Sequence, residues 1–485
     1  MNLRSKHSPT VGIVGGGLAG LAAGCALADS GFQVTLFERR PYLGGRASSY
    51  EHPGTGEVVD NCQHVLLGCC TNLIQFYDRF GIQNKIRWYD RLTFLEPGGQ
   101  ASTIAPSALP APLHNGPSFL RAMNLTFVDK LSIAAAMAAL APRVPKDNGE
   151  SFLDWLRQHG QTNGAIERFW KTILVSALNE DLDCMSVANA AQVIRESFLK
   201  SAAAGRMGVP IVPLTQLYSA AGDYIRARGG EVRLRSGVDC FRAEPGGVTL
   251  VAAGEEGGFE FVVFAVSFDV MARLLPQTSV ADPLRATLDR FQTSPITGIH
   301  LWFDRQISDL DHAVLLDRTI QWMFHKSRIL LREEQDLSPG GSRSAKDMAS
   351  ASQTNGSYVE LVVSSSKALV EKSKAEIIDL ALKELREFFP QAREATLLKS
   401  TVIKEVHATY SPRPGVDAFR PPAETPWPRA FLAGDWTATG WPATMEGAVR
   451  SGYIAAERIA RVSGRQNATF LVPDLPPAGL MRMFR

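Results

Sequence analysis

The sequence predicts an α/β fold in which a parallel-sheet domain is interleaved with a second, α+β domain. Two observations carry this prediction: strand patterns of the parallel type recur along the chain, and long segments of different character separate them. The strand patterns lie at 11–14, 33–38, 231–235, 259–266 and 430–433. Segment 90–205 is Pro-rich at first and then helical, whereas 270–405 alternates apolar and polar residues, which is typical of an antiparallel sheet. These inserted segments are predicted to form the second domain.

A glycine-rich turn follows the first predicted strand, and a predicted helix follows the turn. Gly15, Gly17 and Gly20 fit the spacing G-x-G-x-x-G. Gly15 permits the tight turn, Gly17 lets the backbone approach a pyrophosphate, and Gly20 lets the helix pack closely on the strand. The N–H groups at the start of the helix, those of Leu18 and Ala19 among them, carry the partial positive charge that phosphates need.

An acidic residue ends the second predicted strand. Glu38 lies 23 residues after Gly15, where its carboxylate can bond the hydroxyls of a ribose. The same charge disfavours a 2′-phosphate, although Arg39 and Arg40 follow directly. This part of the sequence predicts a Rossmann-type dinucleotide site, and on its own it admits both NAD and FAD.

A second glycine pair favours FAD. Gly44-Gly45 lets the backbone pass close to the cofactor, and Arg46 can neutralise the charge of a pyrophosphate or of a reduced flavin. Taken alone, these residues would suit an ordinary turn with a solvated arginine equally well. Farther along the chain, the turn at Gly237-Val238 is where the main chain commonly meets an adenine, so Val238 is a predicted contact.

The C-terminal part of the chain supplies the second half of the predicted site. The strand at 430–433 ends in Gly434-Asp435, and a carboxylate there can bond the ribityl chain of a flavin. The N-terminus of the helix that follows can face the pyrimidine edge of the flavin, which gains negative charge on reduction. An ordinary strand-loop-helix is the alternative. The predicted contacts are Gly434, Asp435, Thr444, Met445, Glu446 and Ala448, and the predicted cofactor is FAD.

Composition limits the class of protein. A chain of 485 residues is too long for one compact core, so more than one domain is expected. The net charge of +2 gives no reason to expect a nucleic-acid partner. The six cysteines form no C-x-x-C pair and the nine histidines show no metal-ligand spacing, so we expect reduced thiols, no metal and a cytoplasmic location. No apolar run is long enough to span a membrane, and the polar start predicts no signal peptide.

The predicted domains alternate along the chain. The FAD-binding domain is expected to comprise 1–89, 206–270 and 406–465, and the substrate domain 90–205 (helical part) and 271–405 (sheet part), before a tail at 466–485. A helix at 210–228 is predicted to lead into the third parallel strand. Residues 338–357, rich in Ser, Gly and Ala, are predicted to be a disordered hairpin extension.

The paired glycine-rich segments resemble those of the flavin amine oxidase and carotenoid desaturase superfamily. Within it the chain closely resembles the hydroxysqualene dehydroxylases of hopanoid synthesis, from about residue 10 to 465. Cys62 departs from the pattern, because many members have glycine there, and 338–357 is unusually long. The segments that carry the resemblance are Asp60–Cys69 (similar to D-N-x-Q-H-x-x-x-G), Phe169-Trp170 with Ser176–Asn179, Leu301–Asp304, and the ending Gly434–Gly452.

This resemblance implies a flavin amine oxidase-like fold and an enzyme that removes the hydroxyl of hydroxysqualene, a C30 isoprenoid, with reduced FAD, giving squalene and water. An allylic hydroxyl leaves more readily when it is protonated, and hydride from the flavin can then quench the cation. His64 is the first candidate acid, because histidine can donate a proton near neutral pH. Alternatively, Gln63 and His64 only hold the backbone or the flavin, and Glu446 is a poorer candidate acid. Candidates for either the pocket wall or the core are Trp436, Trp441 and Tyr453.

A squalene-like substrate partitions into bilayers, so the resemblance leaves open a peripheral contact with the inner membrane. The candidate surfaces are 119–141 and 480–485, although a core helix or a frayed terminus would have the same pattern. Two other functions stay open: an oxidative flavoenzyme of the carotenoid desaturase or amine oxidase type, and a non-enzymatic lipid carrier on the same architecture. The oligomeric state and the reductant of the flavin are not predicted.

Overall fold

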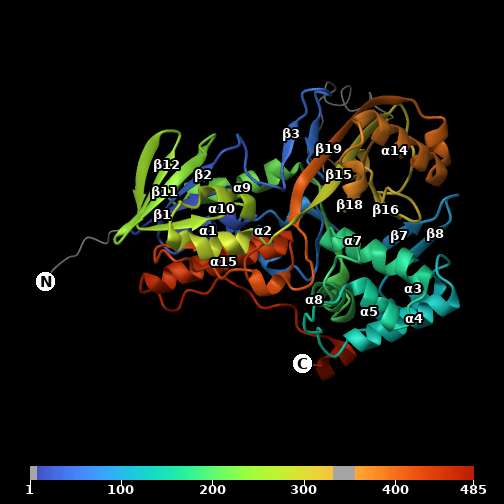
Figure 1. Cartoon of the computed structure of the whole chain (residues 1–485). Helices are drawn as coiled ribbons and strands as arrows, with labels where there is room; N and C mark the ends of the chain where they lie inside the picture. The colour runs from blue at the N-terminus through green and yellow to red at the C-terminus, as the bar shows by residue number, and fades with distance from the viewer. Residues whose placement is uncertain (1–7, 331–355, 485) are drawn as a thin grey trace.

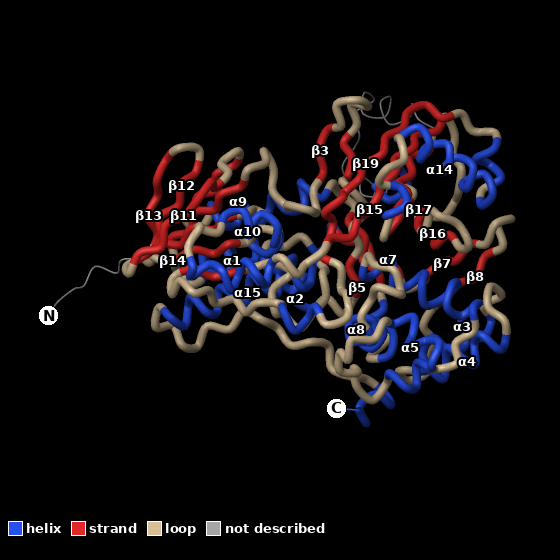
Figure 2. Tube along the Cα trace, in the orientation of Figure 1, coloured by secondary structure: helices blue, strands red, loops and turns tan. Residues whose placement is uncertain are grey.

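The computed structural model describes residues 8–330 and 356–484, and it confirms the predicted fold class. Two parts lie side by side: a parallel sheet flanked by helices, and a larger sheet with a layer of helices beneath it (Figures 1 and 2). The chain passes between them several times, so each part contains segments from both halves of the sequence. Residues 338–355 of the predicted hairpin extension lie outside the described residues.

The parallel sheet brings together the five strand patterns seen in the sequence. Its order is β10-β2-β1-β14-β20, and every neighbouring pair is parallel. Because both faces are covered, the central strands are continuously apolar rather than alternating. The strands are β1 (Thr10–Val14), β2 (Gln33–Glu38), β10 (Glu231–Leu234), β14 (Phe261–Phe264) and β20 (Ala430–Leu432).

Helices and a small antiparallel sheet cover the two faces. Gly452 lets one helix lie directly on another, since a Cβ there would overlap the carbonyl oxygen of Ala19. The helices that share one apolar core are α1 (Leu18–Asp29), α2 (Thr71–Arg79), α9 (Leu214–Arg226) and α15 (Met445–Val462). The other side carries β11 (Val238–Glu244), β12 (Gly247–Ala252), β13 (Glu255–Phe259), α10 (Phe268–Leu274) and α11 (Asp282–Leu288).

The second part is built on a seven-stranded sheet of order β19-β15-β18-β17-β16-β7-β8. Its pairs are antiparallel except for β16 with β7. One face packs against α14 (Lys374–Phe388). The strands are β7 (Leu92–Leu95), β8 (Ala101–Ile104), β15 (Thr293–Phe303), β16 (His312–Leu315), β17 (Trp322–Phe324), β18 (Ser357–Ser364) and β19 (Leu397–Tyr410).

Two of these strands come from the segment that the sequence assigns to the helical part. β7 and β8 form a hairpin within 90–205 and join the sheet through β16, which lies more than 200 residues farther along the chain. Four-residue strands on either side of a Pro-Gly-Gly turn carry too little periodicity to be recognised alone. The position of β7 and β8 in the seven-stranded sheet is therefore set by the pairing of β7 with β16.

The rest of this segment forms helices around a buried aromatic core that includes Phe152, Trp155 and Trp170. Its helical run is interrupted by two π-helical turns, at Ile166–Lys171 and Arg195–Leu199. The helices are α3 (Gly116–Arg121), α4 (Phe127–Leu140), α5 (Phe152–Gln158), α6 (Asn163–Ala165), α7 (Thr172–Leu178) and α8 (Val187–Ile194).

Short strands connect the two parts. The helix predicted at 210–228 begins only at Leu214, because the residues before it form the strand β9 (Met207–Pro210) and a turn. That strand pairs with β5 (Leu66–Leu67) and β6 (Ile86–Tyr89), while β3 (Ser49–Glu51) pairs with β4 (Val58–Asp60). Within 8–330 and 356–484, no helix combines the length and apolarity that crossing a membrane requires.

Candidate active site

A cavity of about 900 Å³ lies between the parallel-sheet part and the seven-stranded sheet. Segments from the whole length of the chain line it, from the turn after β1 to the start of α15. The candidate acid His64 lines it as well. Of the residues predicted to contact the cofactor, all but Gly20 line this cavity: Gly15, Gly17, Leu18, Ala19, Glu38, Arg39, Gly45, Arg46, Val238, Gly434, Asp435, Thr444, Met445, Glu446 and Ala448.

The start of α1 forms one end of the cavity. Gly17 caps this helix without a side-chain hydrogen bond to its first N–H groups. A Cβ at Gly17 would meet nothing nearer than the Cα of Gly45, at 3.8 Å, so the space beside it is open. An uncapped helix N-terminus in an open cavity suits a pyrophosphate.

Gly20 serves the turn alone, whereas Gly15 both shapes the turn and lines the cavity. A Cβ at Gly20 would overlap the carbonyl oxygen of Gly15, and Gly15 itself has a φ of +109°. A side chain at Gly15 would also lie 2.6 Å from the carbonyl oxygen of Ala265, on the strand β14 side. Both glycines therefore keep the turn tight enough for α1 to start directly behind the phosphate position.

Glu38 is held at the edge of this end. Its carboxylate accepts hydrogen bonds from the N–H groups of Gly16 (2.7 Å) and Arg40 (2.8 Å). These bonds orient the side chain toward the cavity, where its remaining lone pairs can accept hydrogen bonds from ribose hydroxyls. Arg39 and Val238 line the same end. The arrangement fits the nucleotide half of FAD.

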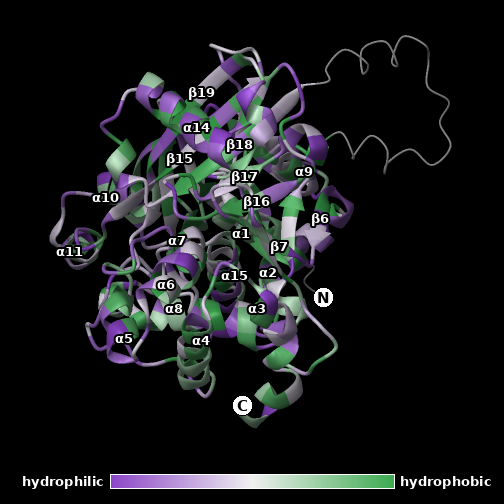
Figure 3. Cartoon of the chain, turned by 90° about the vertical axis from the view of Figure 1, so that its right-hand side faces the viewer, coloured by the Kyte–Doolittle hydropathy of each residue, from purple (hydrophilic) through white to green (hydrophobic). Residues whose placement is uncertain are grey.

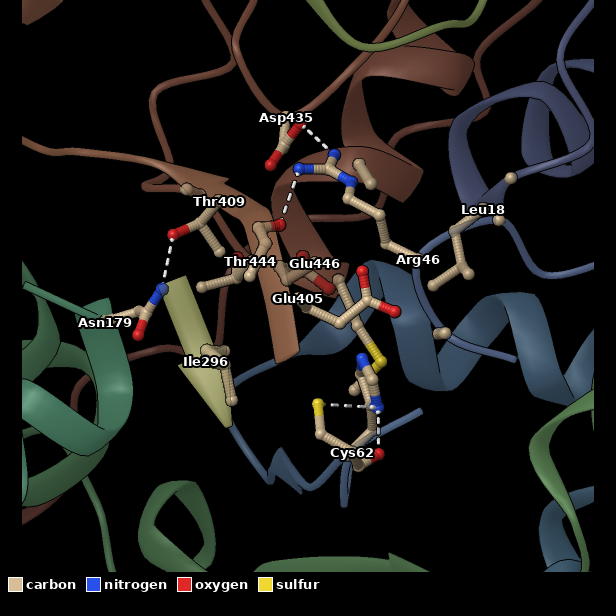
Figure 4. Close-up of a pocket in the computed structure, with 18 of the residues that line it drawn as sticks. Leu18, Arg46, Cys62, Asn179, Ile296, Glu405, Thr409, Asp435, Thr444 and Glu446 are labelled. Carbon is tan, nitrogen blue, oxygen red and sulfur yellow. Dashed lines mark hydrogen bonds and ion pairs between the residues drawn. The ribbon is translucent and has the colours of Figure 1, made fainter. Parts of the chain in front are cut away.

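Arg46 joins the two halves of the predicted site. Its Nη2 donates to Oδ1 of Asp435 at 2.6 Å, and its Nη1 donates to the carbonyl oxygen of Ala408 at 3.0 Å. Burial by itself would lower the pKa of Arg46, but the carboxylates around it, Asp435 foremost with Asp269 and Glu405, together raise that pKa above its usual value. The cation is therefore firmly charged beside the predicted position of the flavin. Figure 4 shows Arg46, Asp435 and Glu405 grouped in the same part of the cavity.

An irregularity in β19 opens toward the cavity. Between the pairs Ser294–Thr409 and Ile296–Glu405, β15 advances two residues while β19 advances four. All residues from Lys404 to Thr409 line the cavity as a result. β-Bulges redirect side chains in this way and are common beside active sites. Asn179 holds the bulge from the helical side, because its Nδ2 donates to Oγ1 of Thr409 at 2.9 Å.

Glu405 is a functional candidate that the sequence did not reveal. It lines the cavity, and Nδ2 of Asn61 donates to its Oε1 at 3.3 Å and to the carbonyl oxygen of Arg46 at 2.7 Å. In the sequence Glu405 is one charged residue at the end of an alternating strand, which is typical of a solvated position. Only the bulge turns it inward.

His64 is neutral in this setting. Its Nδ1 lies 2.8 Å from the carbonyl oxygen of Cys62, and because a carbonyl only accepts, Nδ1 carries the proton. Burial lowers the pKa of His64 below its ordinary value of 6.5. In the neutral ring Nε2 is an acceptor. The side chain can therefore deliver a proton only after it has gained a second one.

A buried charge cluster supports the loop that carries His64. Nζ of Lys326 lies 2.7 Å from Oδ2 of Asp60, 2.9 Å from Oε1 of Gln63 and 3.6 Å from Oε2 of Glu360. Burial, with the Asp60 charge adding to it, raises the pKa of Glu360 to about 8 despite the nearby ammonium. The pKa of Asp60 is lowered, because Lys326 outweighs the effect of burial. The cluster thus holds one ion pair and one protonated carboxyl near neutral pH.

The start of α15 reaches the cavity through its backbone. Thr444 caps the helix, with its Oγ1 accepting from the N–H of Gly447 at 3.1 Å. The Glu446 side chain points elsewhere: its two oxygens accept from the N–H groups of Asn72 and Leu73, and Nε of Arg450 donates to it at 2.7 Å. This fully buried carboxylate caps α2, so any contact of Glu446 with the cofactor is made by its main chain.

The three aromatic candidates divide between wall and core. Trp441 lines the cavity. Trp436 is buried and donates a hydrogen bond from Nε1 to the carbonyl oxygen of Val266. The hydroxyl of Tyr453 donates a hydrogen bond to Oε1 of Gln75. These two side chains belong to the core.

Beyond the flavin position, the cavity continues as an apolar compartment against the seven-stranded sheet and the helices. Its walls come from β7, β16, β17 and β18, from α7 and α8, and from the strands before α9. The apolar lining residues include Leu67, Leu92, Phe94, Ile173, Val193, Phe198, Met207, Ile296, Val314, Trp322, Phe324 and Val362.

Comparison with known proteins agrees with this geometry. The family model of flavin-containing amine oxidoreductases matches residues 18–460. The chain is 27% identical over 492 residues to the 15-cis-phytoene desaturase of Capsicum annuum, which covers 95% of this chain and 80% of that protein. It is also 27% identical to the 15-cis-phytoene desaturase of Synechococcus elongatus, over 93% of this chain and 95% of that one.

Solved structures share the fold. Putrescine oxidase bound to putrescine superposes with a TM-score of 0.68 at 16% identity, covering 95% of this chain and all of that one. An oxidoreductase from Methanosarcina mazei has a TM-score of 0.69 at 17% identity, over 91% of this chain and 98% of that one. The dinucleotide end, the Arg46–Asp435 pair and the family match together identify the cofactor as FAD. The chain belongs to the family of flavin-containing amine oxidoreductases, as an FAD-dependent oxidoreductase of the amine oxidase and carotenoid desaturase type.

Proposed function

We propose that this enzyme reductively removes the hydroxyl of hydroxysqualene to give squalene. The observation that carries the proposal is the lining of the cavity: one cavity of about 900 Å³ combines an apolar compartment with a polar edge that contains Arg46, His64 and Glu405. A hydrocarbon chain with one hydroxyl near its middle matches such a site. Two of the most similar relatives are named as desaturases of phytoene, which is also an isoprenoid, and this supports the substrate class.

The atoms and electrons of this reaction balance with one proton from the protein and one hydride from reduced FAD. A proton added to the hydroxyl lets the C–O bond break, so that water leaves and an allylic cation remains. Bound, reduced FAD supplies the hydride that forms the new C–H bond. The apolar walls exclude other water, which would otherwise trap the cation.

Two side chains of this chain are candidates for handling the proton and the cation. His64 must first become protonated, and its lowered pKa opposes this. Glu405 in its acid form can donate to the hydroxyl, and as a carboxylate it can stabilise the cation that follows. We assign proton delivery to Glu405 first and to His64 second on geometry: Glu405 lines the polar edge of the cavity near Arg46 (Figure 4), and Asn61 holds its carboxyl group in position.

Desaturation is the second candidate function, because those relatives are named for it and match nearly the whole chain. It runs in the opposite direction: oxidised FAD would accept hydride from a C–H bond. The same apolar compartment would hold the substrate, and a base would replace the acid.

The decisive experiment mixes anaerobically photoreduced holoenzyme with hydroxysqualene and follows flavin absorbance together with the product by mass spectrometry. Dehydroxylation predicts reoxidation of the flavin with one squalene formed per flavin. In a parallel arm, oxidised holoenzyme is mixed with phytoene. Bleaching of the flavin and loss of two hydrogens there, with no reaction in the first arm, would replace our proposal by desaturation.

A further inference from the structure

One face of the molecule exposes a group of large apolar side chains that no described segment covers. We name as the apolar face the exposed outer residues of α3, α4, the loops beside them and the C-terminal turn. Its most exposed members are Leu113 (51%), Leu120 (63%), Met123 (64%), Phe127 (68%), Val128 (62%), Leu131 (56%) and Met483 (77%). Scattered apolar residues are normal on a surface, but a contiguous group of this kind marks an interaction site.

The helix α4 is apolar on both sides. Ile133, Ala136 and Leu140 face the core, while the outer side continues from Leu131 with exposed alanines. Its acidic residue, Asp129, is buried and accepts hydrogen bonds from Thr126 and Thr162. A helix that faced water would carry polar residues on its outer side.

The C-terminal turn extends this face. η10 (Gly479–Phe484) returns to the helical layer, where the N–H of Leu480 donates to the carbonyl oxygen of Ala111 at 2.8 Å. Met481 is fully buried in the same core as Ile133, and this anchors the exposed Met483 beside the helices. The two candidate membrane surfaces that the sequence suggests separately, 119–141 and 480–485, thus lie together on the apolar face. Figure 3 shows α4 and the C-terminal turn at the lower edge of the molecule.

We infer that the apolar face docks onto an anionic lipid bilayer, and that it lies at the entrance for the substrate. This inference rests on the proposed function, since a C30 isoprenoid resides in membranes. Exposed basic side chains accompany the face, and they are Arg121, Arg143, Lys146 and Arg482. Between 105 and 146 the sequence contains one acidic residue, the buried Asp129.

This charge pattern favours a bilayer over a second copy of the chain. Basic residues around an apolar face are attracted to anionic headgroups, and each one near the membrane surface adds to the free energy of membrane binding. In a symmetric dimer through the same face, the basic residues of one copy would lie against those of the other, and their repulsion would disfavour the dimer. α4 has 14 residues, so it would lie in the plane of the interface rather than cross it.

The apolar face lies on the same part of the molecule as the apolar end of the cavity, with the β7–β8 hairpin between them. α3 packs on β8 through Ser118, whose Oγ donates to the carbonyl oxygen of Ala105 at 2.7 Å. β8 pairs with β7, whose Leu92 and Phe94 line the cavity. In Figure 1 α3 and α4 lie directly below this hairpin, on the side away from the β11–β13 sheet. The shielding layer between face and cavity includes Phe119, whose ring packs edge-on against Phe169 at 5.7 Å.

Vesicle flotation of the holoenzyme tests the inference. We expect wild type to float with vesicles of phosphatidylglycerol and phosphatidylethanolamine, and to float much less with phosphatidylcholine alone. The variant L120S/F127S/L131S should reduce flotation at least tenfold. The matched control V280S/L398S/V462S replaces apolar residues that are equally exposed elsewhere, and it should float as wild type does. Flavin absorbance and Tm check that all variants are folded.

Three results would overturn the inference: no flotation of wild type, equal loss in the control, or a wild-type dimer that the face variant converts to a monomer without any vesicle binding. Activity distinguishes this failure from failure of the proposed function. With detergent-dispersed hydroxysqualene, the variant L120S/F127S/L131S should turn over substrate as fast as wild type. With hydroxysqualene supplied in vesicles, the same variant should lose its turnover. A protein that floats but turns over neither form would refute the function and leave the docking surface standing.

Discussion

Arg46 and Asp435 are 389 residues apart in the chain, yet their side chains form an ion pair of 2.6 Å in the wall of the cavity. The pair connects the loop after β2 to the loop after β20, and Arg46 also holds the bulge of β19 through the carbonyl oxygen of Ala408. Three separate segments of the flavin site are therefore fixed to one another by one guanidinium group. Its planar fork of donors suits this role better than a lysine.

Replacing Arg46 tests this role. Arg46→Met leaves the Asp435 side chain, only 5% exposed, without a cation, and because Arg46 itself is 38% exposed we expect a loss of stability of about 1–2 kcal/mol. Arg46→Lys should lie between wild type and Arg46→Met, because it keeps the charge but not the fork. Thermal unfolding of the apoprotein and flavin-fluorescence titration measure both effects. The double variant R46M/D435N should be less damaging than the sum of the single changes; strict additivity would contradict a direct pair.

Gly17 and Gly20 should respond differently to alanine. At Gly17 a Cβ has space in the protein but would occupy the phosphate position, so Gly17→Ala should fold normally and lose FAD affinity by at least about tenfold. At Gly20 the Cβ overlaps the backbone of Gly15, so Gly20→Ala should lower Tm or prevent folding. Circular dichroism and flavin content separate the two results. A G17A protein that binds FAD as tightly as wild type would place the pyrophosphate elsewhere.

The buried carboxyl of Glu360 predicts a pH-dependent stability. Its pKa is about 8 in the folded protein against an ordinary value of 4.5, so between these pH values the folded state keeps a proton that the unfolded chain has released. Stability is therefore lost as pH rises through this range, by on the order of 4 kcal/mol in total. The Tm of wild type should fall more between pH 5.5 and about pH 7 (one unit inside each end of the range) than that of Glu360→Gln. The variant Glu57→Gln, at a partly exposed site outside the buried cluster, is the control and should follow wild type.

Glu405 should matter for turnover more than for folding. Glu405→Gln keeps the size of the side chain but can neither donate a carboxyl proton nor stabilise a cation, so we expect kcat to fall by about 100-fold or more with Tm nearly unchanged. Single-turnover reoxidation of the reduced flavin by hydroxysqualene measures the step. His64→Gln is the comparison: if it slows the reaction more than Glu405→Gln, the order of our two assignments is wrong.

A proton delivered by His64 would leave a distinct pH profile. Because the pKa of His64 lies below 6.5, the doubly protonated ring increases only as pH falls through that lowered value. We expect any contribution of His64 to appear as a rise in kcat/KM toward low pH that is missing in His64→Gln. A wild-type profile without this rise between about pH 5 and 7.5 would restrict His64 to holding the loop.

The sequence alone determined the local geometry at the predicted dinucleotide end of the cavity. Gly15, Gly17, Gly20 and Glu38 act through local geometry, a tight turn, a helix start and a strand end, and such geometry depends on neighbours in the chain. The strand patterns of the parallel sheet were equally legible, because strands buried on both faces are continuously apolar. The position of Asp435 at a strand end followed from the same reasoning.

Only the tertiary structure decided which of these residues act together. The β19 bulge, and with it the inward turn of Glu405, depends on the register between strands that are about a hundred residues apart. The Glu446 side chain caps α2 rather than facing the cavity, because the packing of α15 against α2 brings it the N–H groups of Asn72 and Leu73. The C-terminal turn joins α3 and α4 in one apolar face for the same reason: contacts between remote segments are set by how the surfaces pack, and local spacing does not encode that packing.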